Sequence, residues 1–199
     1  MGRRSSFNRQ QVISDALELF WSRGFYACSL KQLEEVTEIH PGSLYYHFQN
    51  KERLYICVIE HYLEWRLQPR IDKYLSYGPS PLKLRRFFTS GYRHEQEAHY
   101  RNCCFLVTTS NELHLLPPEA SNLVRKGIQM LRKSFIAFIG KFTAPQKNNT
   151  TINQEVIACK LLNLYLSIQL MAKVDPNQHA LDKQVKQSLD NLVVPALKP

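Results

Sequence analysis

A short polar and aromatic stretch, HPGSLYYHFQNKERL at residues 40–54, holds side chains that could contact phosphates or base edges. Histidine, serine and tyrosine donate and accept hydrogen bonds, and lysine carries a positive charge. Leu44 and Phe48 are four residues apart, so one face of a short helix can anchor the segment, with Ile39 at its entry, while the other side chains project away. This division of side chains suits a helix that reads base edges with its first residues and holds the backbone with hydroxyls and cations.

The preceding sequence predicts two helices that would support this segment. Apolar residues recur at helical spacing over residues 12–20, and Gly24 then ends the first helix. The sequence Ser29-Leu30-Lys31-Gln32 matches a capping box, in which the serine and glutamine side chains satisfy amides at a helix start. A second short helix therefore begins there and is expected to bury Leu33 and Val36.

A third helix is expected to begin at Pro41, because the fixed φ of proline suits the first helical position. It spans about two turns, since Asn50 offers an N-cap for a fourth helix that starts at Lys51. Two short helices joined by a turn of about four residues form a helix-turn-helix motif.

The rest of the chain also has helical periodicity, and no convincing strand or repeat interrupts it. We predict an all-α fold of about nine helices, with an N-terminal domain at 1–50 and a larger helical domain at 51–199. The fourth helix, 51–68, connects the two and is expected to stop before Pro69. The later helices are expected at about 81–98, from about 102 to Pro117-Pro118, across 124–142, at about 154–174 and across 181–192, with a polar loop at 143–153.

Composition narrows the class of protein. The 199 residues carry a formal net charge of +9, which suggests an anionic partner. Residues 1–53, however, hold seven Lys or Arg against six Asp or Glu, so bulk charge does not locate a nucleic-acid site. With neither a secretory signal nor a membrane-spanning apolar run, the chain is expected in the cytoplasm and off the membrane.

Cysteine and histidine spacing predicts no metal site and no disulfide framework. The five cysteines form an odd number without a CxxC pair, and Cys103 and Cys104 are expected to be buried small apolar residues. His94 and His99 would point in different directions on a helix. We also find no nucleophile, metal or phosphate-loop constellation, so neither enzymatic activity nor a cofactor is expected.

Residues about 9–55 resemble the N-terminal domain of the TetR family of bacterial transcriptional regulators. The resemblance rests on Ala16-Leu17-Glu18-Leu19-Phe20, on Gly24-Phe25, and on Gly42-Ser43-Leu44-Tyr45-Tyr46-His47-Phe48 followed by Lys51-Glu52. It implies a sequence-specific DNA-binding regulator, and a repressor that a small-molecule effector releases from its operator. The residues expected to contact double-stranded DNA are Ser29, Lys31, His40, Pro41, Gly42, Ser43, Tyr45, Tyr46, His47 and Lys51.

The turn departs from the family pattern. The family usually has Ala-Gly-Val-Ser where this chain has Thr37-Glu38-Ile39-His40, so Glu38 stands at the turn glycine and His40 at the serine cap. Glu38 is expected to strain the turn or to bring a carboxylate near phosphates. With the weak charge of residues 1–53, this departure leaves open a helical ligand-binding or protein-interaction dimer that has lost specific DNA binding.

For the larger domain, the resemblance implies a homodimer whose last two helices pair with their copies into a four-helix bundle. A two-fold dimer places its recognition helices about 34 Å apart, one turn of B-DNA, and reads a near-palindromic operator. The resemblance also implies a small organic effector among helices four to eight. The candidate pocket residues, for which ordinary core packing is the alternative, are Trp65, Tyr92, Phe105, Thr109, Tyr165 and Gln169.

Overall fold

The computed structural model of the protein describes residues 7–78, 80–93, 103–141, 150–175 and 177–193, with the backbone alone for 150–153 and 193. Within these ranges the chain is all-α and contains no strand, as the sequence predicts. The described residues form nine helices when the continuous rod from Lys51 to Ser76 is counted once. His94, His99 and the centre of the predicted polar loop lie outside the described residues.

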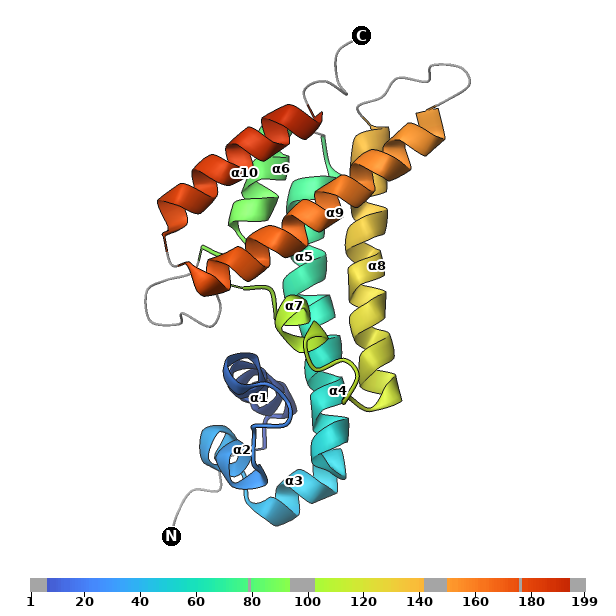
Figure 1. The fold of residues 1–199 in the computed structure, drawn as a ribbon. Coiled ribbons are helices and arrows are strands. Elements are labelled where there is room, and N and C mark those ends of the chain that lie inside the picture. Colours follow the sequence, from blue (N-terminus) through green and yellow to red (C-terminus); the bar gives the residue numbers. More distant parts are fainter. Residues whose placement is uncertain (1–6, 79, 94–102, 142–149, 176, 194–199) are drawn as a thin grey trace.

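Three short helices occupy one end of the molecule (Figure 1). They are α1 (Arg9–Arg23), α2 (Leu30–Thr37) and α3 (Pro41–Phe48). Gly24 ends α1 with φ +83°, and the Ser29–Gln32 capping box begins α2 as predicted. Leu33 is buried, but the expectation for Val36 is wrong, because its side chain is 41% exposed. Thr37, one helical turn beyond Leu33, takes the buried position on α2 instead and donates a hydrogen bond to the Leu33 carbonyl.

A single helical rod leads away from α3 and runs most of the length of the molecule (Figure 1). It comprises α4 (Lys51–Tyr62), the π-helical turn η1 (Leu63–Leu67), α5 (Gln68–Ile71) and a second π-helical turn η2 (Asp72–Ser76). The predicted stop before Pro69 is therefore wrong. In η1 the Gln68 N–H bonds to the Leu63 carbonyl, five residues back, and this wider turn accommodates a proline that an α-helical ladder would exclude.

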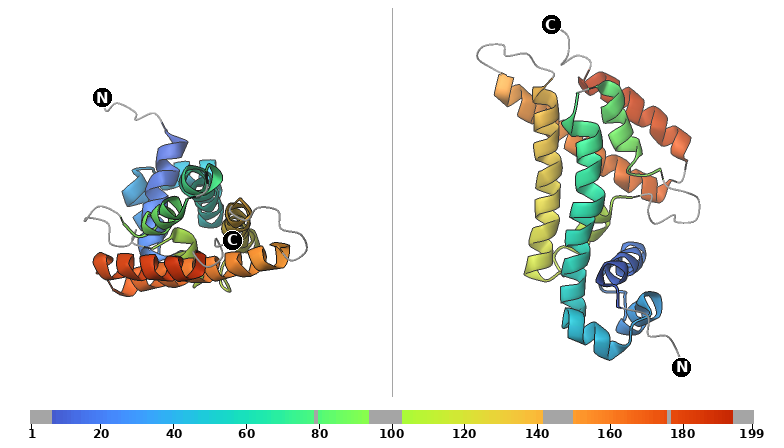
Figure 2. Two further views of the ribbon diagram at one scale, coloured as in Figure 1. Left: turned by 90° about the horizontal axis from the view of Figure 1, so that it is seen from above. Right: turned by 180° about the vertical axis from the view of Figure 1, so that it is seen from behind.

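The remaining helices pack around the far part of this rod. They are α6 (Pro81–Thr89), α7 (Phe105–Ser110), α8 (Pro118–Gly140), α9 (Thr150–Val174) and α10 (Gln178–Val193). Helix α8 lies beside the rod, and α9 and α10 form one side of the body (Figure 2). The helices predicted at 81–98 and from 102 are shorter in the structure, because turns follow Thr89 and Ser110. Helix α9 begins about one turn before the predicted start.

The adjacent residues Cys103 and Cys104 occupy buried positions, as small apolar residues do. Cys103 and Cys104 are both buried, as predicted, and all five thiols are free. Burial raises the pKa of Cys103 to about 11, so its thiol stays protonated near neutral pH. No group of three or more candidate metal ligands occurs among the described residues.

Helix α9 is a long and strongly apolar helix of the body. Residues Gln154–Val174 are long and apolar enough to cross a membrane by length and composition alone, and 44% of an apolar run of 18 residues within them is buried in the molecule. Its buried face packs against α8 and α10. The exposed face carries Val156, Leu170, Met171 and Val174, whereas the exposed positions of α10, apart from Ala180, are polar over the described residues.

Candidate DNA-binding surface and cavity

Helix α3 is anchored by one face and exposes the other. Leu44 and Phe48 are almost completely buried, and Ile39 packs partly against the same core. On the opposite flank, Tyr45 is 48% and Tyr46 is 82% exposed. Because α3 lies at the tip of the molecule (Figure 1), nothing described in the structure covers this flank. Its shape and polarity therefore suit insertion into a groove of DNA.

The first residues of α3 leave their side chains available for external contacts. His40 is the N-cap residue, and its carbonyl accepts hydrogen bonds from the Ser43 and Leu44 amides at 2.9 and 3.1 Å. Its imidazole makes no capping bond, so the ring is not engaged in starting the helix. Pro41, Gly42 and Ser43 are all exposed, and the position of a Cβ on Gly42 has no other atom within 4 Å.

The turn before α3 keeps a helix-turn-helix path despite its unusual sequence. Glu38 adopts a left-handed conformation with φ +54° and ψ +23°, the conformation for which glycine is favoured. The expected strain is thus present in the backbone of this residue, since a side chain disfavours positive φ. The Glu38 side chain is exposed, and α2 and α3 still pack against each other.

Two of the predicted phosphate contacts have intramolecular partners. The His47 ring stacks on Phe7 with a centroid distance of 3.6 Å. Lys51 Nζ lies 4.4 Å from the centroid of the Phe25 ring, and partial burial lowers the pKa of this lysine. Ser29 uses its hydroxyl to cap α2, at 3.2 Å from the Gln32 amide, whereas Lys31 is exposed beside it. The roles of Phe7 and Phe25 could not be read from the spacing within residues 40–54.

A cavity of about 280 Å³ lies where α1, the rod and the segments after α6 and before α7 meet. Of the six predicted pocket residues only Trp65 lines it. The full lining is Trp21, Tyr62, Trp65, Arg66, Pro69, Arg70, Lys73, Tyr74, Ser90, Gly91 and Cys104. Burial raises the pKa of Tyr62, so its hydroxyl remains neutral at the cavity wall.

The other five predicted pocket residues are core residues, because their side chains are almost fully buried and fill space. Phe105 packs against Trp21 and Tyr62, and Tyr165 packs against the aromatic rings of α6. Thr109 accepts a hydrogen bond from the Tyr55 hydroxyl at 3.2 Å. Gln169 accepts one from the Cys104 amide at 2.8 Å.

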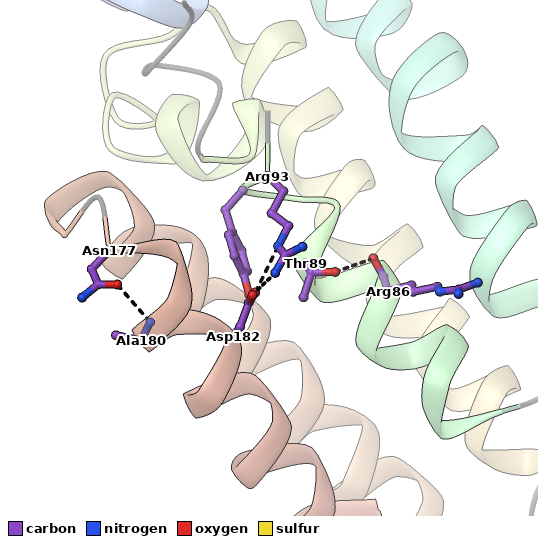
Figure 3. Close-up of polar contacts among 7 residues, drawn as sticks. Arg86, Thr89, Arg93, Asn177, Ala180 and Asp182 are labelled. Carbon is purple, nitrogen blue, oxygen red and sulfur yellow. Dashed lines mark hydrogen bonds and ion pairs between the residues drawn. The ribbon is translucent and has the colours of Figure 1, made fainter. Parts of the chain in front are cut away.

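Tyr92 serves to hold α10 against the end of α6 instead of lining the cavity. Its hydroxyl donates a hydrogen bond to Asp182 Oδ1 at 2.8 Å. Arg93 forms an ion pair with the same carboxylate, as Figure 3 shows. Asp182 is thereby satisfied although it is buried, which secures α10 to the rest of the body.

The family model for bacterial regulatory proteins of the tetR family matches residues 12–57, which span the helix-turn-helix and the start of the rod. An uncharacterized HTH-type transcriptional regulator of Bacillus subtilis, YezE, is 24% identical over 195 residues, covering 96% of this chain and 100% of that relative. The chain belongs to the TetR family of transcriptional regulators. It is accordingly a DNA-binding regulator, in a family whose members are dimeric.

Two further relatives of this TetR-family chain are informative. The transcriptional repressor ComR of Escherichia coli is 38% identical over 63 residues, which cover 32% of this chain and 30% of ComR. A cysteine mutant of the regulator CifR, solved with a 26-base-pair operator duplex, has a TM-score of 0.72 and 24% identity. That match covers 96% of this chain and 100% of CifR, and it shows a common fold.

Three contacts join the DNA-binding end of this TetR-family protein to its body. The indole N–H of Trp21 on α1 donates to the Cys103 carbonyl at 2.9 Å. The Phe25 amide donates to the Glu112 carboxylate at 2.7 Å, and the Tyr26 hydroxyl donates to the Leu115 carbonyl. All three acceptors lie immediately before or after α7. A displacement of the α7 segment would therefore also move α1 and the turn that follows α1.

Proposed function

We propose that this regulator is a repressor that binds a near-palindromic operator as a homodimer and leaves it when a small molecule occupies the cavity. The observation that carries the proposal is the exposed flank of α3, anchored by Leu44 and Phe48 at the end of a rigid rod. The similarity of 63 residues of the chain to the repressor ComR supports repression as the direction of control. Residues 1–50 would read DNA, and residues 51–199 would bind the effector and the second copy.

Different side chains around α3 would contact the bases and the phosphates. His40, Pro41 and Ser43 would reach base edges from the start of the helix, and Gly42 would let the backbone approach closely. Tyr45 and Tyr46 would bond to phosphates, with support from the neighbouring groups Ser29, Lys31, His47 and Lys51. Phosphate contacts of this kind set the position of the protein, whereas the base contacts set its sequence preference.

Homodimerisation would use the exposed apolar face of α9, with α10 beside it. Val156, Leu170 and Val174 recur along this face, and a run of exposed apolar side chains on a soluble protein indicates a covered surface. Burying this face against its copy also accounts for the apolar character of α9 without a membrane. The protein would act in the cytoplasm, without enzymatic activity or a cofactor.

Release from the operator would follow from a change at the junction of the two domains. The cavity contacts both Trp21 of α1 and the rod that ends at α3. A ligand that prefers a wider arrangement of these elements would shift the population toward dimers whose α3 helices no longer match one turn of B-DNA. The ligand shifts this equilibrium only by its difference in affinity for the two states.

A mobility-shift titration of the full-length protein tests the proposal. The probe is the DNA upstream of its own coding sequence, compared with a shuffled duplex of equal length at two salt concentrations. The proposal expects a sequence-specific complex whose affinity falls steeply with salt, because phosphate contacts release counterions. Equal affinity for both duplexes would overturn it in favour of a protein-interaction dimer.

A further inference from the structure

The cavity has a strongly positive wall. Arg66, Arg70 and Lys73 all line it, and none of its lining residues is acidic. The three positions follow one another at helical spacing, and the π-helical turns η1 and η2 on either side of α5 set their orientation. Arg66 has Glu18 within 4.0 Å, so part of its charge is balanced. Arg70 and Lys73 make no ion pair with the described residues.

Arg70 is held in place entirely by neutral groups. Its Nη2 donates to the Phe87 carbonyl at 3.0 Å and its Nε donates to the Ser90 hydroxyl at 3.2 Å. The guanidinium also lies 4.9 Å from the centre of the Phe87 ring. A partly buried guanidinium keeps its charge, and burying that charge without an anion is costly. The geometry therefore fixes the position of Arg70 but leaves its charge uncompensated among the described residues.

A second unpaired donor, Gln169, lies behind Gly91 and outside the cavity lining. Gln169 is fully buried, and its Oε1 accepts the Cys104 amide at 2.8 Å, which fixes the orientation of the side-chain amide. Its Nε2 then has no hydrogen-bond acceptor. Gln169 therefore turns a donor, and no acceptor, toward the side of Gly91 on which Arg70 lies, so it does not compensate the charge of the guanidinium.

Gly91 lets the Gln169 amide and the Arg70 guanidinium pack closely against its backbone. A Cβ placed on Gly91 would lie 2.4 Å from Gln169 Nε2 and 3.1 Å from Arg70 Nη2. A side chain at position 91 would therefore displace both groups, so the glycine keeps Arg70 in its place on the cavity wall. The opposite walls of the cavity are aromatic, formed by Trp21, Tyr62, Trp65 and Tyr74.

We propose that the cavity binds a small aromatic carboxylate, with the carboxylate on Arg70 beside Gly91 and the ring against the tryptophans. Lys73 adds a further positive charge near the cavity mouth. This inference rests on the proposed function only in taking the cavity as the effector site, and it names the chemical class of that effector. Binding itself requires no DNA, so it can be tested separately.

The two tryptophans make the test direct. The chain contains only Trp21 and Trp65, and both line the cavity, so tryptophan fluorescence reports on this site alone. The probes are 4-nitrobenzoate and its neutral counterpart 4-nitrobenzamide, both quenchers of indole emission, with free N-acetyltryptophanamide as the reference for collisional quenching. We expect the carboxylate to bind the full-length protein at least about tenfold more tightly, the effect of one charge-assisted hydrogen bond.

Three variants locate the carboxylate. Arg70→Met and Gly91→Ala are each expected to weaken 4-nitrobenzoate binding by about tenfold and to leave 4-nitrobenzamide nearly unchanged. Lys73→Met, at an exposed position, is expected to give a smaller loss of the same kind and serves if Arg70→Met fails to fold. Lys126→Met, on the exposed side of α8, is the matched control and should bind both probes as the unaltered protein does.

Equal binding of the two probes, binding of neither, or an unchanged preference in Gly91→Ala and Lys73→Met would overturn the proposal. Displacement of the protein from its operator is measured separately from ligand binding. If 4-nitrobenzoate binds with the expected preference but does not displace the operator, the carboxylate site stands and the release mechanism fails. If neutral molecules displace the operator while 4-nitrobenzoate binds no more tightly than 4-nitrobenzamide, the release mechanism stands and the carboxylate site fails.

Discussion

The tip of α3 and the cavity present their polar side chains in different ways. At the DNA-binding end, α3 buries two apolar anchors and exposes its polar flank, so Tyr46 is among the most exposed aromatic residues described. At the cavity, Arg70 is partly buried among neutral groups, although Arg66 and Lys73 beside it are exposed. A surface that meets a large, preformed partner can stay exposed, whereas a site for a small molecule must surround it.

Disruption of the homodimer is expected to have the largest effect, because a single α3 cannot contact both halves of a near-palindromic operator. Leu170→Arg places a charge on the exposed face of α9, where the two copies are proposed to meet. We expect dissociation to monomers and a loss of operator affinity of roughly 100-fold or more, because an unpaired charge would be buried in the interface. Size-exclusion chromatography with light scattering and a mobility shift measure both effects.

The control for this variant is Leu82→Arg, which adds the same charge at an exposed apolar position on α6. It should remain dimeric and bind the operator normally. Dissociation of both variants, or of neither, would contradict the assignment of the interface to α9.

The anchored face of α3 should matter for stability and its exposed flank should not. Leu44→Ala is expected to lower the free energy of unfolding by about 2–5 kcal/mol, because it leaves a cavity in a closely packed core. Tyr46→Ala, two positions away, should change it by no more than about 0.5 kcal/mol. Urea denaturation followed by circular dichroism compares the two variants, and a similar cost for both would show that the flank is a packed surface.

Within the exposed flank, base and phosphate contacts should separate. His40→Ala is expected to reduce discrimination at one base pair by about 1–3 kcal/mol, since its imidazole is not used to cap α3. Tyr46→Ala should weaken binding to all operator variants by a similar factor. Titrations against a set of single-base operator variants measure both. If His40→Ala weakened binding to all operator variants by the same factor, His40 would contact the DNA backbone instead of a base.

The smallest expected effect concerns the turn. Glu38→Gly should raise the free energy of unfolding by about 1 kcal/mol, because glycine adopts the observed φ of +54° without steric cost. Operator affinity should increase or stay the same, since the substitution also removes a negative charge near the phosphates. Thermal unfolding and a mobility shift test this, and a loss of stability would show that the Glu38 side chain makes a favourable contact.

The DNA-binding end was predictable because its determinants are local. The capping box at Ser29, the proline that starts α3 and the pair Leu44 and Phe48 act within a few residues of one another, and each is found as expected. Val36 was placed wrongly because a two-turn helix has too few apolar positions to define its buried face by periodicity alone.

The cavity was not predictable in the same way, because it is assembled from distant parts of the chain. Trp21, Arg70 and Gly91 come from α1, from α5 and from the turn after α6, and only packing brings them together. Arg70 directly follows Pro69, before which the fourth helix was expected to stop, so Arg70 was not assigned to a helix. The spacing of Arg66, Arg70 and Lys73 was the available signal, and it becomes visible once the helix is continued through the proline.

Photo-crosslinking to the operator tests most directly whether the exposed flank of α3 enters the duplex. A benzophenone amino acid replaces Ser43 at the start of α3, or replaces Tyr77, which is 74% exposed beyond the far end of the rod. The account predicts specific crosslinks to bases of the operator from position 43 and none from position 77. Crosslinks of equal yield from both positions, or none from position 43 while the complex remains intact, would contradict it.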